Sequence, residues 1–165
     1  MRTTLNVFLF LWLTSISFAQ SKIDKTLKKL NEASVDYIHA DSLKNGSNVV
    51  LLDARERSEY EVSHLKNAMW VGYDTFELDS IVQKIKNKNS EIVVYCSIGV
   101  RSEDIGEKLQ QAGYTKVKNL YGGIFEWKNR GNPVFDSSGN ETEQVHAFNK
   151  QWGKLLKNGK KVYGP

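Results

Sequence analysis

Residues 96–102 are the part of this sequence best suited to covalent chemistry, because they begin with its only cysteine. Cys96 ends an apolar run at 92–95 that indicates a buried strand, and a helical pattern follows over 102–112. A short loop between a strand and a helix N-terminus presents unpaired backbone N–H groups and the positive end of the helix dipole. That field favours a thiolate at Cys96, and Arg101 adds a positive charge. The sequence therefore predicts a nucleophilic sulfur beside a binding loop for a small anion.

The loop residues receive separate expected roles. The backbone N–H groups should hold the substrate, with Gly99 permitting close approach. Arg101 should bind the anionic end of the substrate; alternatively, it forms an ion pair with Glu103, Asp104 or Asp53. Ser102 should cap the following helix. The candidate catalytic residue is thus Cys96, and the candidate substrate-binding residues are Ser97, Ile98, Gly99, Val100, Arg101 and Ser102.

The N-terminal residues 1–19 have the pattern of a secretory signal peptide. Arg2 supplies a basic start, residues 7–13 form an unbroken apolar stretch, and a small-x-small ending follows at 17–19. We expect an exported protein, periplasmic or secreted, with no membrane anchor. In an oxidising compartment cysteines usually occur in pairs, so a lone thiol there is a reactive group or a buried small hydrophobe. Its position in a loop favours exposure to solvent and hence reactivity.

The remaining chain alternates strand-like and helix-like segments. The expected strands are 35–39, 48–53, 68–71, 91–95 and 117–120, and the expected helices between and after them are 56–62, 76–85, 102–112 and 122–127. Such alternation predicts an α/β domain whose parallel sheet is covered by helices on both faces.

The chain divides into four expected parts. A signal peptide at 1–19 precedes a polar helix at 20–34, an α/β domain at 35–135 and a tail at 136–165. In the tail a linker-like turn precedes five apolar residues at the spacing of one helix face: Val145, Phe148, Trp152, Leu155 and Leu156. We expect an amphipathic helix that packs back onto the domain, with docking of a protein partner as the alternative.

Four segments together resemble the single-domain rhodaneses, which are thiosulfate or persulfide sulfurtransferases. They are 51–56 (LLDARE), 60–68 with His64, 95–102 with Cys96, and 120–127 (LYGGIFEW). The resemblance covers about residues 35–135. It implies a five-stranded parallel sheet flanked by helices, and Cys96 as the residue that accepts sulfur from a thiosulfate-like donor and passes it to a thiol or cyanide. Ser63 and Asn67 depart from the family pattern, since glycines are frequent at both positions.

Two further functions for the loop are weighed against sulfur transfer. Phosphatases with a cysteine nucleophile place arginine six positions later, whereas Arg101 stands five positions after Cys96, and the smaller loop favours sulfur over phosphate. A redox role through mixed disulfides lacks a second cysteine to resolve them. A non-catalytic binding module that uses the tail helix is the main alternative.

The remaining polar candidates receive structural or supporting roles. Asp53 and Arg55 follow a strand and should hold neighbouring loops through hydrogen bonds, and His64 should fix a turn. His39 and His146 are isolated in the sequence, so we expect no metal and no cofactor. The net charge of +4, which becomes +3 without Arg2, comes largely from lysines near the ends of the chain. This is too sparse for a nucleic-acid surface.

Overall fold

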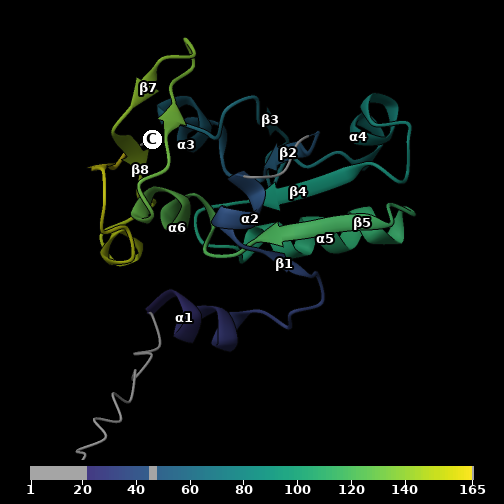
Figure 1. Cartoon of the computed structure of the whole chain (residues 1–165), viewed down its shortest axis with the longest axis horizontal. Coiled ribbons are helices and arrows are strands. Elements are labelled where there is room, and N and C mark those ends of the chain that lie inside the picture. Colours follow the sequence, from purple (N-terminus) through teal and green to yellow (C-terminus); the bar gives the residue numbers. More distant parts are fainter. Residues whose placement is uncertain (1–21, 45–47, 165) are drawn as a thin grey trace, which may run out of the picture.

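A five-stranded sheet organises the computed structural model, which describes residues 22–44 and 48–164. The expected signal peptide lies outside these residues. The strands, in spatial order, are β1 (Tyr37–Ile38), β5 (Lys116–Leu120), β4 (Glu91–Tyr95), β2 (Val50–Asp53) and β3 (Met69–Trp70) (Figure 1). Every neighbouring pair is parallel, which confirms the predicted sheet.

Strand β4 lies at the centre of the sheet, between β5 and β2, and its last four residues are buried. Val93 and Tyr95 pack into one apolar cluster, while Ile92 and Val94 pack into another. Alternate side chains of a strand point to opposite faces, so a sheet covered on both sides gives the continuous apolar run seen in the sequence. Cys96 directly follows this strand.

Helices cover both faces of the sheet (Figure 1). The described helices are α1 (Lys22–Leu30), α2 (Ala40–Lys44), α3 (Arg57–Val62), α4 (Leu78–Lys84), α5 (Arg101–Gln111) and α6 (Gly123–Asn129). Side chains of α1, α2 and α6 join the cluster around Tyr95, and side chains of α4 and α5 join the cluster around Val94. The short helix α2 was not expected from the sequence. None of the helices in the described ranges is long and apolar enough to cross a membrane.

The amphipathic α-helix expected in the tail is wrong. An antiparallel pair, β6 (Val134–Phe135) and β7 (Glu141–Thr142), is followed by β8 (Gln144–His146), a single 3-10 turn η1 (Trp152–Lys154), and β9 (Lys160–Val162), which pairs with β8 in parallel. Phe148 has a φ of +62°, which does not occur within a right-handed α-helix, so the expected helix is interrupted at this residue.

The tail nevertheless packs back onto the domain. Val145, Leu155 and Leu156 are buried in the same apolar cluster as Tyr95. The helical spacing of these residues is satisfied by a strand and a turn that bury the same side chains, because tertiary contacts override a periodic pattern in a short segment. The described residues of the tail therefore contain no α-helix that a partner could bind.

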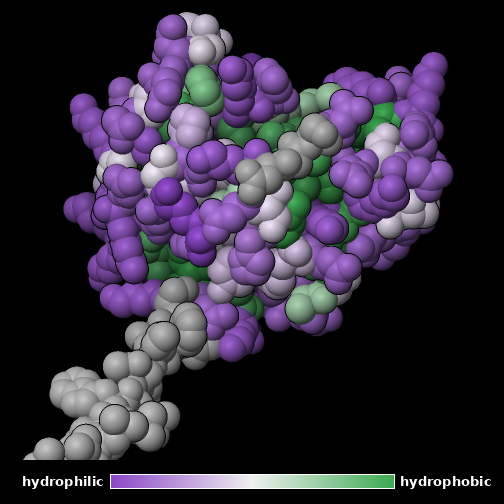
Figure 2. All heavy atoms as spheres, in the orientation of Figure 1, coloured by the Kyte–Doolittle hydropathy of each residue, from purple (hydrophilic) through white to green (hydrophobic). Residues whose placement is uncertain are grey.

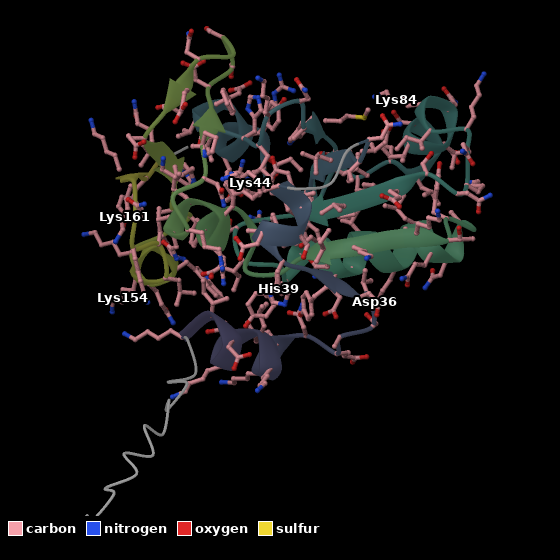
Figure 3. All side chains as sticks on the ribbon, in the orientation of Figure 1. Asp36, His39, Lys44, Lys84, Lys154 and Lys161 are labelled. Atoms are coloured by element: carbon pink, nitrogen blue, oxygen red, sulfur yellow. The ribbon has the colours of Figure 1, made fainter. Side chains whose placement is uncertain are left out.

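The surface seen in Figure 2 is mostly hydrophilic, and hydrophobic atoms appear mainly in recesses between polar side chains. Lys154 and Lys161 lie on the same side of the molecule in Figure 3, and Lys84 lies at another edge. These lysines are distributed around the periphery, as expected from the sequence.

Candidate active site

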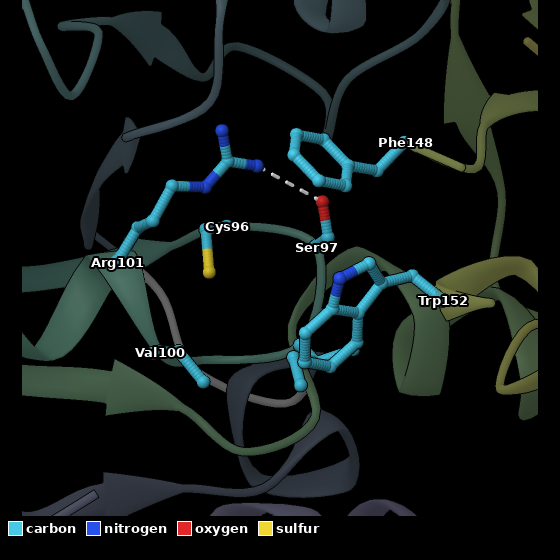
Figure 4. A pocket seen from close by; sticks show the side chains of 7 residues that line it. Cys96, Ser97, Val100, Arg101, Phe148 and Trp152 are labelled. Carbon is cyan, nitrogen blue, oxygen red and sulfur yellow. Dashed lines mark hydrogen bonds between the residues drawn. The ribbon is translucent and has the colours of Figure 1, made fainter. Parts of the chain in front are cut away.

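Cys96 lies in the loop between β4 and α5, in contact with a cavity of about 160 Å³. Its side chain is almost entirely buried, with 1% exposed, so the expectation of a thiol open to solvent is wrong. Figure 4 shows Sγ pointing into the space that the loop encloses. The residues that line the cavity are Cys96, Ser97, Ile98, Val100 and Arg101 from the loop, and Phe148 and Trp152 from the tail.

The loop turns its backbone toward the sulfur. The Gly99 N–H donates a hydrogen bond to Cys96 Sγ over 3.1 Å, and Gly99 has a φ of +109°. Glycine adopts this conformation without the steric penalty of a Cβ atom. The carbonyl oxygen of Gly99 points away from the sulfur and accepts bonds of 2.8 Å from the side-chain amides of Asn31 and Asn119. These bonds keep a backbone donor, and not an acceptor, against Sγ.

Ser102 does not cap α5, because Val100 occupies the N-cap position and Ser102 is fully buried inside the first turn. Its Oγ lies 2.8 Å from Asn119 Oδ1 and 3.5 Å from Cys96 Sγ. The amide of Asn119 donates to Gly99, so its Oδ1 is the acceptor for the hydroxyl proton. Ser102 therefore links the sulfur to β5.

Arg101 pairs with Glu59 of α3, and not with any of the three carboxylates considered from the sequence. Its Nη1 and Nη2 donate to the two oxygens of Glu59 over 2.8 and 3.0 Å. Nη2 also donates to Ser97 Oγ over 3.1 Å (Figure 4), and Ser97 Oγ donates to Glu59 Oε1 over 2.9 Å. This two-pronged pairing joins the loop to a helix that precedes it by about forty residues in the chain.

Charge balance explains why a carboxylate remains ionised in this buried position. Burial alone raises the pKa of Glu59, but the hydrogen bonds and charge of Arg101, with a smaller contribution from Arg55, bring this pKa below its ordinary value. Burial alone lowers the pKa of Arg101, whereas the hydrogen bond to Glu59 and the nearby sulfur of Cys96 raise it overall. The loop thus rests on an ionised pair.

The other polar candidates lie outside the cavity. Asp53 and Arg55 form a fully buried ion pair at 2.7 Å, and Arg55 Nη2 donates to the carbonyl oxygen of Ser63 over 2.6 Å. His64 stacks on Tyr60, and its Nδ1 lies 3.1 Å from the Tyr60 carbonyl oxygen. These residues join β2 to the segment after α3, and they do not line the cavity beside Cys96.

The N-terminal end of helix α6 is hydrogen-bonded to the backbone of the loop. The N–H groups of Ile124 and Phe125 donate to the carbonyl oxygens of Cys96 and Ser97, over 2.9 and 3.1 Å. A Cβ atom at Gly123 would lie 2.2 Å from the Cys96 carbonyl oxygen, so glycine is required for this close approach. The turn expected at Gly122 and Gly123 therefore has a second purpose, which is to let the helix end reach the loop backbone.

Sequence reasoning missed four residues of the site: Glu59, Asn119, Phe148 and Trp152. The Glu56-x-x-Glu59 spacing is a helix-start signal, and the Glu56 N–H does donate to Glu59 Oε2. It gave no indication of contact with Arg101. Among the described residues no group of three or more His, Cys, Asp or Glu side chains is placed to hold a metal.

Comparison with known proteins identifies the fold family. The profile of the rhodanese-like domain matches residues 38–130, more than half of the chain. The protein belongs to the rhodanese-like family. The solution structure of a rhodanese-like domain from Anabaena has 27% sequence identity and a TM-score of 0.55, and the match covers 61% of this chain and 78% of that one. A thiosulfate sulfurtransferase from Pseudomonas aeruginosa has a TM-score of 0.56 at 20% identity, covering 74% of this chain and 23% of that one; at that identity it supports the fold alone.

Curated relatives also match a part of the chain. A tRNA uridine(34) hydroxylase from Enterobacter is 36% identical over 84 residues, and one from Salmonella paratyphi B is 33% identical over 101 residues. These matches cover 49% and 58% of this chain, but only 24% and 29% of the two relatives. The chain spans less than a third of the length of either one. Together, the family and the relatives indicate sulfur-related chemistry.

Proposed function

We propose that this rhodanese-like protein is a sulfurtransferase in which Cys96 carries sulfur as a persulfide between a small anionic donor and a thiol or cyanide acceptor. The observation that carries the proposal is the Gly99 N–H on Cys96 Sγ, 3.1 Å away, in a loop that borders a cavity. A backbone donor at this position stabilises negative charge on sulfur, in the thiolate and in the persulfide.

In the first step the Cys96 thiolate attacks the outer sulfur of a donor such as thiosulfate. A bond forms between the two sulfurs, the sulfur–sulfur bond of the donor breaks, and sulfite leaves with the electron pair. Arg101, on the wall of the cavity, would attract the anionic end of the donor. Because it also balances Glu59, we expect it to contribute less than an unpaired arginine would.

In the second step an acceptor thiolate or cyanide attacks the outer sulfur of the persulfide. The new bond forms on that sulfur, the bond to Cys96 breaks, and its electron pair returns to the cysteine as a thiolate. No resident cofactor is needed for either step, since the sulfur atom moves without a net change in the enzyme. The cycle regenerates the starting enzyme.

Intact-mass measurement tests this proposal. Protein lacking residues 1–19 is incubated with thiosulfate or with an organic persulfide, and the expected result is the gain of one sulfur atom that disappears on adding an acceptor. Cys96→Ser should gain none. If only the organic persulfide adds sulfur to the protein, thiosulfate is not the donor, but the proposal of sulfur transfer stands. If no donor labels the protein, sulfur transfer is refuted and a binding role is favoured.

We also propose that the protein is exported, on the basis of the leader-like pattern in residues 1–19. Expression of the full chain in a bacterium followed by fractionation should yield a form outside the cytoplasm that begins at Gln20. A full-length cytoplasmic product would contradict this part of the proposal and leave the chemistry of Cys96 unaffected.

A further inference from the structure

Phe148 occupies an unusual position at the edge of the cavity beside Cys96. It is 48% exposed, and it is one of three large hydrophobic residues that the described part of the chain leaves exposed. Its φ of +62° lies in the left-handed region, which a bulky aromatic residue rarely adopts. Such strain persists only where the surrounding structure imposes it, and it is frequent at ligand-binding positions.

The surrounding hydrogen bonds hold this conformation. The Asn149 N–H donates to the Ala147 carbonyl oxygen over 2.8 Å, which closes a three-residue turn around Phe148. The Phe148 N–H donates to His146 Nδ1 over 3.2 Å, and the Ala147 N–H donates to Val162 of β9 over 2.8 Å. The turn is therefore anchored to the pair of strands β8 and β9, and it directs the ring of Phe148 toward the loop.

Trp152 forms the adjacent part of the wall. The side chain of Asn149 accepts a hydrogen bond of 3.0 Å from the Trp152 N–H, so one residue orders both aromatic positions. In Figure 4 the side chains of Phe148 and Trp152 extend from the tail toward the loop that carries Cys96. With Ile98 they make the lining largely apolar. Both rings lie outside residues 38–130, the region that matches the rhodanese-like family.

The charge in the cavity is already compensated. Arg101 is the one charged residue among those lining it, and both of its terminal nitrogens bind Glu59. Its guanidinium carbon also lies 5.4 Å from the centroid of the Phe148 ring. An apolar wall beside a neutralised cation favours the carbon body of an organic molecule more than it favours a second small anion.

We propose that Phe148 and Trp152 are specificity-determining residues that bind the carbon body of the sulfur acceptor, and that this acceptor is a thiol carrying an apolar group. The inference rests on the proposed persulfide cycle. The acceptor thiol loses its proton to solvent, and its sulfur attacks the outer sulfur of the Cys96 persulfide. The bond to Cys96 breaks, the electron pair returns to Cys96, and the product is an organic persulfide held against the two rings.

Single-turnover transfer from the purified Cys96 persulfide tests the inference, using two thiols of similar acidity. Benzyl mercaptan carries a ring, and 2-mercaptoethanol has a short polar body. Contact of a benzyl group with both rings predicts a second-order rate constant for benzyl mercaptan about ten-fold higher. In Phe148→Ala and in Trp152→Ala this ratio should fall to about two or three, since each change removes one wall. Val82→Ala, on α4 and outside the lining of this cavity, should retain the wild-type ratio.

A wild-type ratio near one, or an unchanged ratio in both variants, would overturn the inference. Equal loss of both rates counts as an unchanged ratio and indicates that the rings only support the loop. A second readout does not depend on sulfur transfer: the rate of Cys96 alkylation by N-benzyl iodoacetamide relative to iodoacetamide. A ratio that favours the benzyl reagent and falls in the variants would support the apolar site even if no donor forms a persulfide. Where the persulfide forms, the transfer ratio alone decides; where none forms, an alkylation ratio that is near one or unchanged in both variants would refute the apolar site.

Discussion

Replacing Glu59 with glutamine tests whether the loop that holds Cys96 depends on the buried ion pair. The change retains the size of the side chain but removes the charge that faces Arg101. Only 1% of the Glu59 side chain and 19% of the Arg101 side chain are exposed, so solvent replaces the lost partner poorly. Glu56, with Oε1 3.8 Å from Arg101 Nη1, offers partial compensation.

The expected loss in the free energy of unfolding follows from these contacts. Removing one member of a buried pair costs about 3–5 kcal/mol, and the partial exposure of Arg101 with the nearby Glu56 brings our expectation to about 2 kcal/mol. In a domain of this size that corresponds to a fall of about 4–8 °C in melting temperature. Urea unfolding at pH 7 measures the difference directly.

The pH dependence of this difference gives a second test. Because the pKa of Glu59 in the folded protein lies below its ordinary value of 4.5, the ionised pair stabilises the fold above pH 4.5. This contribution is lost as the pH falls through the lowered pKa of the folded state. The stability gap between wild type and Glu59→Gln should therefore be constant from pH 7 to about pH 5 and should shrink at lower pH.

Glu61→Gln is the matched control on the same helix. Glu61 pairs with Arg57 at 2.8 Å, but 54% of its side chain is exposed, so we expect a change within about 0.5 kcal/mol. Equal stabilities of the two variants at pH 7 would refute the reasoning. So would a gap that persists undiminished down to pH 3.

Two further changes test the supports of the site by urea unfolding at pH 7. Gly123→Ala places a Cβ atom 2.2 Å from the Cys96 carbonyl oxygen and should lower the free energy of unfolding by more than about 3 kcal/mol. Its control is Gly131→Ala, which is also at positive φ but has no atom within 4 Å of the added Cβ, and it should cost about 1–2 kcal/mol. Similar losses in the two variants would show that the loop moves to accommodate the added atom. Arg55→Leu leaves Asp53 buried without its ion-pair partner and should lower the free energy of unfolding by about 3–5 kcal/mol. The control Arg57→Leu, at an exposed position, should cost less than about 1 kcal/mol. Nearly equal losses would contradict a structural role for the buried pair.

Local pattern was sufficient for the sheet and for the position of Cys96 between β4 and α5. The apolar run before Cys96 requires a strand buried on both faces, and a loop of a few residues must follow before α5 begins. These features depend on neighbours in the chain. The family resemblance rested on the same local segments, and the match over residues 38–130 confirms it.

Local pattern failed for the tail. The helical spacing of its apolar residues predicted one helix, but pairing of β8 with β9 and the left-handed turn at Phe148 distribute those residues between a strand and a 3-10 turn. Val145, Leu155 and Leu156 can be buried in the common apolar cluster in either conformation, so periodicity alone could not choose between them.

The sequence by itself determined where the cysteine lies and which loop surrounds it, because both follow from residues adjacent in the chain. Only the tertiary structure decided what surrounds that loop: Glu59 reaches Arg101 across 42 positions, and Phe148 reaches the cavity from the far end of the chain. Contacts of this kind depend on how the elements pack. The sequence around a polar or aromatic residue does not identify the distant residue that it will contact. The position of the Cys96 sulfur is thus a local property, whereas its burial, the charge balance around it and its apolar wall are properties of the fold.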